Sequence, residues 1–393
     1  MSVFSLVTVF MAALAGPALA ARTDQVQLGA PDGTLPLMLP TTEVVEDGAT
    51  PTKHPLVLFL HGFCLDPVRQ ETSMAGFEQL IDSEQFALAL PTGPSNGGGV
   101  MLPICSAWDG TDGSRLLLPL YMRRPLGDVP FLKNVLKRAI DHMSQSNKPV
   151  DPTRIYAIGL ANGGFMAHRL ACELPQVFAA VGAYTGATGA EDNDSTCVDN
   201  WAELGGTNVL QIHGDADVWV PYEGGVNWPG SADSTRFVAE GMGCDTESPT
   251  TNPDAFAIPA GGTTHTVSVT EYTGCEDGGS STEWRVNGMD HLPGGGSGLK
   301  PLLKRALRWM LEQRQPDATD ETLAAALADA APGNGGSANA PSASAFTTGL
   351  GAGSSAGSLA RYAARTPQLL AGFAGAAVGE AGTSSRPAAA LAG

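Results

Sequence analysis

IYAIGLANGG, at residues 155–164, is the segment from which we infer the architecture of this protein. Its first four residues are apolar, as is typical of a strand buried on both faces. Gly159 and Gly163 then flank three residues, and glycine is the residue that a sharp bend tolerates best because it has no β-carbon. The segment predicts a strand that turns abruptly into a helix and presents Ala161 at the bend.

The spacing of these glycines is that of the G-x-S-x-G nucleophile elbow, whose central residue is a serine. Ala161 occupies that central position here. A methyl group can neither attack a carbonyl carbon nor release a proton. The hydroxyl that covalent ester hydrolysis requires is therefore missing.

Other apolar runs predict further strands of the same sheet, and helical patterns lie between them. The predicted strands are residues 55–60, 86–90, 155–158, 179–183 and 209–212, and the predicted helices are 129–143, 165–172 and 299–311. Continuous apolar runs suit parallel strands that are covered by helices on both faces. The alternation predicts an α/β fold with a doubly wound, mostly parallel sheet.

Composition divides the chain into three parts. Residues 1–20 are apolar and end in Ala18-Leu19-Ala20, which fits the cleavage rule of a secretory signal peptide, although no basic residue precedes them and an uncleaved anchor is the alternative. We expect residues 21–315 to form one domain. Residues 316–393 are rich in Ala, Gly, Ser and Pro, and we expect a largely disordered tail with at most short helices.

The cysteines and the net charge indicate the environment and exclude some partners. The six cysteines are Cys64, Cys105, Cys172, Cys197, Cys244 and Cys275. An even number suits disulfides in an oxidising compartment, and pairing in sequence order is our prediction among the fifteen possible sets. The formal charge of −18 argues against nucleic acid or an anionic membrane as partner. We expect a secreted, extracellular protein without a metal or other cofactor, free of the membrane once the signal is removed.

Two later segments supply an acid and a histidine in the order nucleophile, acid, histidine. Asp217 follows the predicted strand 209–212 and could orient an imidazole. His291 lies in a glycine-rich loop before the last predicted helix, where it could act as a general base. The backbone amides of Phe63, after the strand 55–60, and of Asn162, after the nucleophile position, are the expected oxyanion-hole donors.

Several longer motifs accompany these residues over residues 52–311. They are His61-Gly62, Cys105-Ser106-Ala107-Trp108, Asp128 to Leu132, Asp151 to Tyr156, Gly159 to Gly164, Met166, Arg169 to Cys172, His213 to Tyr222 and Asp290-His291. With these motifs the chain resembles the secreted polyhydroxybutyrate depolymerase and feruloyl esterase family of α/β-hydrolases. The resemblance implies that Ala161 stands at the serine position, with Asp217 as the acid and His291 as the base. Met289-Asp290 is a second departure, because the family usually has small residues before this histidine.

The interpretation that we favour is a pseudo-esterase, which keeps an ester-binding pocket without turnover. The expected ligand is a small ester, a polyester or a plant cell-wall phenolic ester. Trp108, Trp219 and Tyr222 are candidate substrate-binding residues because flat aromatic rings suit phenolic or sugar faces. Core packing is the alternative for each of these side chains.

Four other interpretations stay open at this stage. Water activated by His291 and Asp217 could hydrolyse esters slowly. Cys64, beside the expected oxyanion loop, could serve as the nucleophile, although a disulfide would make it inert. The alanine codon could be engineered or misread. The tail could carry a matrix or cell-wall interaction, with the α/β domain as a passive scaffold.

Overall fold

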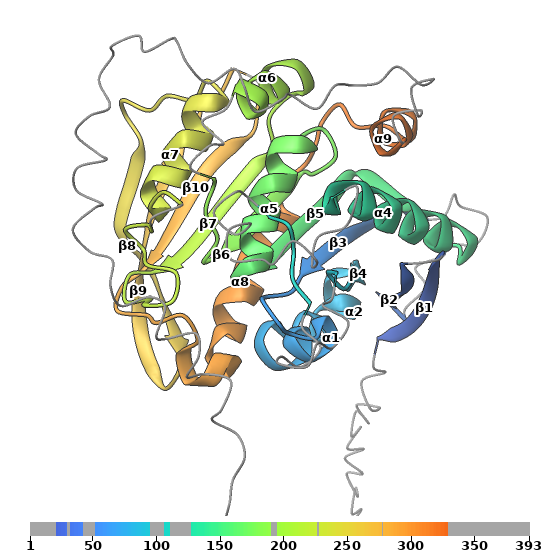
Figure 1. Ribbon diagram of the computed structural model, residues 1–393, viewed down its shortest axis with the longest axis horizontal. Helices are drawn as coiled ribbons and strands as arrows, with labels where there is room; N and C mark the ends of the chain where they lie inside the picture. Colours follow the sequence, from blue (N-terminus) through green and yellow to red (C-terminus); the bar gives the residue numbers. More distant parts are fainter. Residues whose placement is uncertain are drawn as a thin grey trace, which may run out of the picture. The chain divides into compact units, whose positions relative to one another are not determined.

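A computed structural model describes residues 21–29, 32–41, 52–94, 106–110, 127–189, 195–225, 228–276 and 278–328. All of these residues belong to one compact unit. They build a single twisted sheet with helices packed against it (Figure 1).

The sheet has ten strands in its described part, and most of them are parallel. Their spatial order is β1 (Arg22–Gly29), β2 (Gly33–Leu39), β4 (Ala87–Ala89), β3 (His54–Leu60), β5 (Val150–Leu160), β6 (Ala180–Tyr184), β7 (Asn208–Gly214), β10 (Ser280–Val286), β9 (Thr263–Tyr272) and β8 (Thr250–Ala260). The strands from β4 to β10 pair in parallel, and antiparallel strands extend both edges. The carboxyl ends of parallel strands share one edge of the sheet, so the loops after β3, β5, β7 and β10 meet there.

Strand β3 shows why these sequences form the centre of the sheet. All of its residues are buried. Leu56, Leu58 and Leu60 belong to one core cluster, whereas Val57 and Phe59 belong to another. Successive side chains of a strand point to opposite faces, so a continuous apolar run fits a strand that lies between two helical layers.

The helices are divided between the two faces, as the membership of the two clusters shows. On the face of Leu56 lie α4 (Asp128–Gln145), α5 (Asn162–Glu173), α6 (Ser195–Leu204), α7 (Ser231–Gly241) and α9 (Asp320–Leu327). On the face of Val57 lie α8 (Lys300–Leu311) and the short segments α1 (Pro67–Gln70), η1 (Glu71–Ala75), η2 (Phe77–Gln79), α2 (Ile81–Glu84) and η4 (Pro293–Leu299). The predicted doubly wound α/β fold is confirmed.

The five predicted strands correspond to β3, β4, β5, β6 and β7, and the three predicted helices to α4, α5 and α8. Strands β8, β9 and β10 were not predicted. Most of β8 is exposed at the edge of the sheet, so it lacks the apolar run that marked the central strands. At the other edge of the sheet, β1 and β2 form an antiparallel pair.

The described chain continues beyond the domain end predicted at residue 315. Helix α9 begins after Thr319, whose side chain forms a capping box with Thr322. Leu323 and Leu327, one helical turn apart, pack into the first core cluster. The sequence did not predict this packing, because residues 316–393 as a whole are rich in Ala, Gly, Ser and Pro. The predicted signal peptide and the tail beyond residue 328 lie outside the described residues.

None of the helices in the described ranges is both long and apolar enough to span a membrane.

Candidate active site

The elbow has the geometry that its sequence predicts. Strand β5 ends at Leu160, α5 begins at Asn162, and Ala161 between them has φ 51° and ψ −113°. A β-carbon added to Gly159 would overlap the carbonyl of Gly163, and one added to Gly163 would overlap that of Leu60. Glycine is therefore required at both positions, and the bend presents the partly exposed methyl group of Ala161.

The backbone of Ala161 is strained. A positive φ with a β-carbon present is a sparsely populated conformation, which typically costs about 1–3 kcal/mol. Hydrogen bonding holds the residue there, because its N–H donates to the carbonyl of Tyr184 on the adjacent strand β6 at 2.8 Å. The chain thus keeps the bend of a nucleophile elbow around a side chain that cannot react.

Asp217 and His291 come together at the same edge of the sheet. Asp217 lies in the loop after β7 and His291 in the loop after β10, and both side chains are buried. His291 Nδ1 lies 2.7 Å from Asp217 Oδ2. The other carboxylate oxygen accepts the backbone N–H groups of Trp219 and Val220 at 2.8 and 2.9 Å. These contacts fix the orientation of the carboxylate toward the imidazole.

The surroundings of Asp217 keep it ionised. Burial by itself would raise the pKa of this carboxyl group, but hydrogen bonds from His213 and His291 outweigh burial and hold the pKa well below its ordinary value. His213 Nε2 lies 3.6 Å from Asp217 Oδ2 and 2.8 Å from the carbonyl of Val220. A carboxylate in this position holds the imidazole of His291 in one orientation through the 2.7 Å contact with Nδ1.

Tyr184 links the histidine loop to the elbow. Its carbonyl accepts the N–H of Ala161, and its hydroxyl donates to the carbonyl of His291 at 2.8 Å. Burial raises the pKa of the Tyr184 hydroxyl, so the group stays protonated and remains a donor. Tyr184 is therefore hydrogen-bonded both to Ala161 at the elbow and to His291.

The two expected oxyanion donors lie at a helix N-terminus and after a strand. Asn162 is the first residue of α5, where backbone N–H groups lack intrahelical acceptors and the helix dipole favours negative charge. Phe63 follows β3, and the neighbouring amide of Gly62 is already bonded to Gln70 Oε1 at 2.7 Å. Within the described ranges, neither the Asn162 nor the Phe63 amide has a hydrogen-bond acceptor. Both amides therefore keep the capacity to bind an oxyanion.

Trp108 packs in the core beneath the loop after β3 and the start of α5, and it hydrogen-bonds to both. Its indole is completely buried and donates from Nε1 to the carbonyl of His61 at 3.0 Å. Its backbone N–H donates to Asn162 Oδ1 at 2.7 Å, and its carbonyl accepts from Asn162 Nδ2 at 3.1 Å. Trp108 therefore positions Asn162 from the core, which corrects the expectation that its ring lines the substrate pocket.

The other two candidate aromatic residues have different surroundings. Trp219 is 44% exposed and stacks on the His291 ring, with 6.1 Å between centroids and 16° between planes. Tyr222 is buried and donates from its hydroxyl to Glu283 Oε1 at 3.0 Å. Trp219 is thus the one of the three placed beside His291, whereas Trp108 and Tyr222 fit the core-packing alternative.

The disulfides confirm part of the cysteine prediction. Cys172 is bonded to Cys197, and Cys244 to Cys275. Cys64 is also disulfide-bonded, while Cys105 lies outside the described residues. A disulfide sulfur has no thiolate to offer, so the structure excludes Cys64 as the alternative nucleophile.

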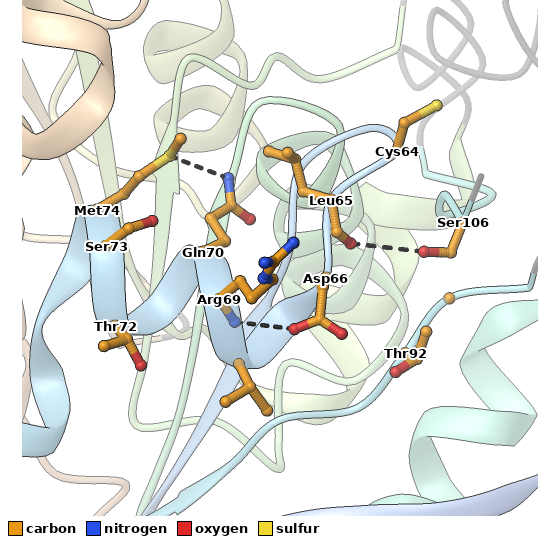
Figure 2. Close-up of a pocket in the computed structure, with 12 residues that line it drawn as sticks. Cys64, Leu65, Asp66, Arg69, Gln70, Thr72, Ser73, Met74, Thr92 and Ser106 are labelled. Carbon is orange, nitrogen blue, oxygen red and sulfur yellow. Dashed lines mark hydrogen bonds between the residues drawn. The ribbon is translucent and has the colours of Figure 1, made fainter. Parts of the chain in front are cut away.

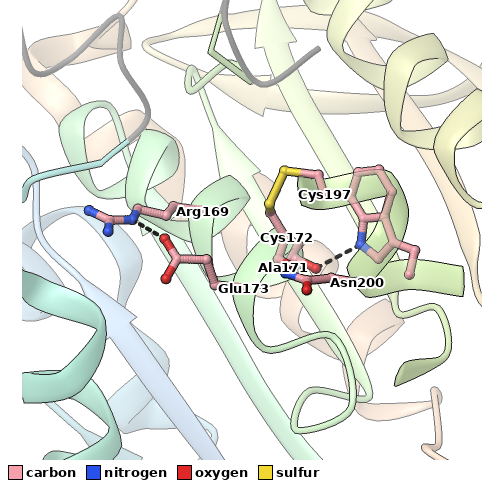
Figure 3. The surroundings of a disulfide bond; sticks show 7 residues. Arg169, Ala171, Cys172, Glu173, Cys197 and Asn200 are labelled. Carbon is pink, nitrogen blue, oxygen red and sulfur yellow. Dashed lines mark hydrogen bonds and ion pairs between the residues drawn. A yellow bond between two sulfur atoms is a disulfide. The ribbon is translucent and has the colours of Figure 1, made fainter. Parts of the chain in front are cut away.

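The Cys172–Cys197 bond fixes the far end of the helix that starts at the elbow (Figure 3). It joins α5 to α6, and Asn200 and Trp201 of α6 donate to the carbonyls of Cys172 and Ala171 at 2.9 and 2.8 Å. Helix α5 is therefore anchored at both termini.

Sequence reasoning missed two supporting residues, His213 and Gln70. His213 was visible as part of the motif before Asp217, but its contact with the carboxylate depends on the turn that brings them together. No sequence signal marked Gln70, whose bond to Gly62 joins α1 to the loop after β3.

The fold is of the α/β-hydrolase type, and it carries a strained elbow and a buried Asp217–His291 pair at one edge of the sheet. No protein-family model matches the chain. The chain is 31% identical over 176 residues to a putative esterase, NocK, from Nocardia uniformis subsp. tsuyamanensis. This alignment covers 45% of this chain and 44% of that protein. The chain is also 30% identical over 138 residues to a poly(3-hydroxybutyrate) depolymerase from Ralstonia pickettii. This alignment covers 34% of this chain and 25% of that protein. The chain thus aligns with less than half the length of each curated relative.

A solved structure shows a wider but more distant similarity. The acetyl xylan esterase from Aspergillus awamori is 16% identical, with a TM-score of 0.49, and the match covers 74% of this chain and 98% of that one.

Proposed function

We propose that this protein is a secreted pseudo-esterase, which binds esters in an α/β-hydrolase site and lacks the nucleophile needed to cleave them efficiently. The observation that carries the proposal is the combination of Ala161 on a strained elbow with Asp217 and His291 in hydrogen-bond contact. The elbow and the acid–base pair persist although the reactive hydroxyl is absent.

The remaining groups suit binding of an ester carbonyl. The backbone N–H groups of Phe63 and Asn162 would donate hydrogen bonds to the carbonyl oxygen, and the N-terminal end of α5 would favour its partial negative charge. In a working triad, loss of the nucleophile costs about 10⁶ in turnover, while the oxyanion hole and binding retain about 10³–10⁴ over water. The chain is therefore expected to bind esters and to turn them over very slowly.

We propose a small ester, a polyester or a plant cell-wall phenolic ester as the ligand. The similarity to a putative esterase and to a poly(3-hydroxybutyrate) depolymerase supports this class. The exposed ring of Trp219 beside His291 offers a flat apolar surface to a substrate.

Export is part of the proposal. Three cysteine pairs predicted from the sequence require an oxidising compartment, and two of them are bonded in the described chain. The apolar residues 1–20 would direct the chain out of the cell and be removed.

A second candidate function is direct hydrolysis by water, and the intact Asp217–His291 contact favours it. His291 would take a proton from water as the hydroxide oxygen attacks the ester carbon. The tetrahedral intermediate would then collapse, and the departing alkoxide would recover the proton from the imidazolium. No acyl-enzyme forms on this route.

Hydrolysis of p-nitrophenyl acetate separates the two candidates. We expect the wild type to remain near the rate in buffer, and Ala161→Ser to gain about 10³-fold or more, because only the nucleophile is absent. The double variant Ala161→Ser/His291→Ala should lose that gain.

The other outcomes are equally informative. An active wild type that His291→Ala silences would support the water mechanism and contradict the pseudo-esterase. If Ala161→Ser is folded and as silent as the wild type, the site is not an esterase site.

A further inference from the structure

A pocket of about 890 Å³ lies beside the loop that follows β3, and Figure 2 shows the side chains around it. Its lining comes mainly from the segment after β3 and from α1 and η1, and it includes Leu65, Arg69, Gln70 and Met74. The volume is that of a typical small-molecule site. Ala161, Asp217 and His291 do not line it, so it is a neighbouring compartment with its own chemistry.

The pocket borders the oxyanion region on one side. Gln70 in its wall accepts the N–H of Gly62, the residue before Phe63. A β-carbon added to Gly62 would lie 3.1 Å from Gln70 Nε2 and 3.3 Å from the carbonyl of Leu160, the residue before Ala161. The same glycine therefore touches both the pocket wall and the elbow.

The same wall also contacts the segment that follows the histidine. Met74 accepts a hydrogen bond from Gln70 Nε2 at 3.7 Å, and a β-carbon added to Gly296 would lie 2.7 Å from the terminal methyl group of Met74. Gly296 belongs to η4, which begins two residues after His291. The wall made by Gln70 and Met74 is thus in contact with both the loop after β3 and η4, which places the pocket beside the site.

Arg69 is the one basic side chain, and Asp66 the one acidic side chain, among the described residues that line this pocket. Figure 2 shows its guanidinium among the other lining side chains, near Leu65 and Gln70. Across the described ranges, no carboxylate forms an ion pair with Arg69, although the chain has 40 acidic residues for 22 basic ones. The nearby Asp66 uses Oδ1 to accept the backbone N–H of Arg69 at 2.9 Å, as the N-cap of α1. The guanidinium fork remains able to bind a planar anion.

Apolar side chains share this pocket with Arg69. Leu65, Val68 and Met74 line the same pocket. A ligand that fills the space therefore needs an apolar chain with a negative group at its far end.

We propose that this pocket is a subsite for an acyl group that ends in a second carboxylate, so that the preferred ligand is a monoester of a dicarboxylic acid. The ester carbonyl lies at the amides of Phe63 and Asn162, the methylene chain lies along Leu65 and Met74, and the distal carboxylate binds Arg69. The proposal rests on the ester-binding function above and specifies its ligand.

Binding to the full-length wild type tests the subsite, because the absent nucleophile leaves the ester intact. The probes are monomethyl adipate and methyl hexanoate, which share an ester and a chain of the same length and differ in the terminal carboxylate. We expect the wild type at pH 7 and low salt to bind monomethyl adipate about tenfold more tightly by calorimetry, as one charge-assisted hydrogen-bonded pair would give. Arg69→Gln should abolish this preference and leave the affinity for methyl hexanoate unchanged. The matched control is Arg138→Gln, which changes another exposed arginine, on α4.

A second variant tests whether the chain itself lies in the pocket. Ser73→Trp places a bulky ring on the lining while keeping Arg69, and it should weaken both esters. Equal affinities of the wild type for the two esters, a preference that survives Arg69→Gln, or unchanged affinities in Ser73→Trp would overturn the subsite while leaving ester binding in place. If the wild type binds neither ester, the proposed function fails, and the subsite fails with it.

Discussion

Ala161 combines the geometry of a reactive residue with an inert side chain. Its φ of 51° is costly for any residue with a β-carbon, and the flanking glycines lie too close to neighbouring backbone to carry one. A chain that needed only a strand-to-helix connection would gain stability from glycine here. The strained alanine supports the proposal that residue 161 occupies a nucleophile position.

Replacement of Ala161 by glycine tests that strain directly. Ala161→Gly should raise the free energy of unfolding by about 0.5–1 kcal/mol, because relief of the positive φ exceeds the entropy lost when glycine is ordered. The control is Ala157→Gly, at a buried strand position of ordinary backbone, which should lower it. Urea denaturation measures both, and equal destabilisation by the two variants would show that Ala161 is unstrained.

Single residues also show what sequence can and cannot predict. The pairing of Asp217 with His291 was predictable from the chain order of nucleophile position, acid and histidine. The strand that places His291 at the same sheet edge as Asp217 is β10, which the sequence did not predict. The burial of Trp108 was not predictable, because an aromatic ring suits a core and a pocket equally well. Its burial depends on contacts with His61 and Phe131, which lie far away in the chain.

Among the elements, the short π-helical segment η1 supports the loop after β3. Glu71 at its start is completely buried, and Oε1 accepts the backbone N–H of Glu78 at 2.9 Å. Burial, together with the nearby Glu78 carboxylate, raises the pKa of Glu71 to about 8. The segment that contains Gln70 and Met74 therefore depends on a protonated carboxyl group.

The raised pKa predicts how stability depends on pH. The folded protein binds the Glu71 proton more tightly than the unfolded chain, so this stabilisation is complete below pH 4.5 and is lost as the pH rises through about 8. Glu71→Gln stays neutral, and it should exceed the wild type in stability by about 4–5 kcal/mol at pH 9 while matching it near pH 4. Thermal melts across this range measure the difference. A pH-independent difference between variant and wild type would contradict the assignment.

The central elements were predictable for a reason that does not extend to the edges. Strands covered on both faces need continuous apolar runs, and β3, β5, β6 and β7 have them. The hairpin of β8 and β9 is largely exposed and carries no comparable pattern. Its position is set by pairing with β10, which sequence periodicity does not reveal.

For the molecule as a whole, the question is where the folded domain ends. Leu323 and Leu327 of α9 pack on the cluster that also contains residues of α4, although the sequence suggested a boundary at residue 315. Lys53 forms an exposed ion pair with Asp320, which adds little to stability. The two leucines are therefore the main attachment of α9.

Two truncations locate the boundary. A chain that ends at residue 328 keeps α9, whereas a chain that ends at residue 315 exposes the surface that the two leucines cover. We expect the shorter chain to lose about 2–4 kcal/mol of stability relative to the longer one. Calorimetric melting of both gives the comparison, and identical melting would show that α9 does not stabilise the domain.

We propose that this site lacks only one oxygen atom, that of a nucleophile at residue 161, and this central claim can be tested directly. The most direct measurement is the pre-steady-state burst of p-nitrophenol from Ala161→Ser, with the wild type and Ala161→Ser/His291→Ala beside it. We predict a stoichiometric burst from Ala161→Ser alone, together with an acyl adduct on residue 161 by mass spectrometry. A folded Ala161→Ser variant that shows neither burst nor adduct would contradict the claim.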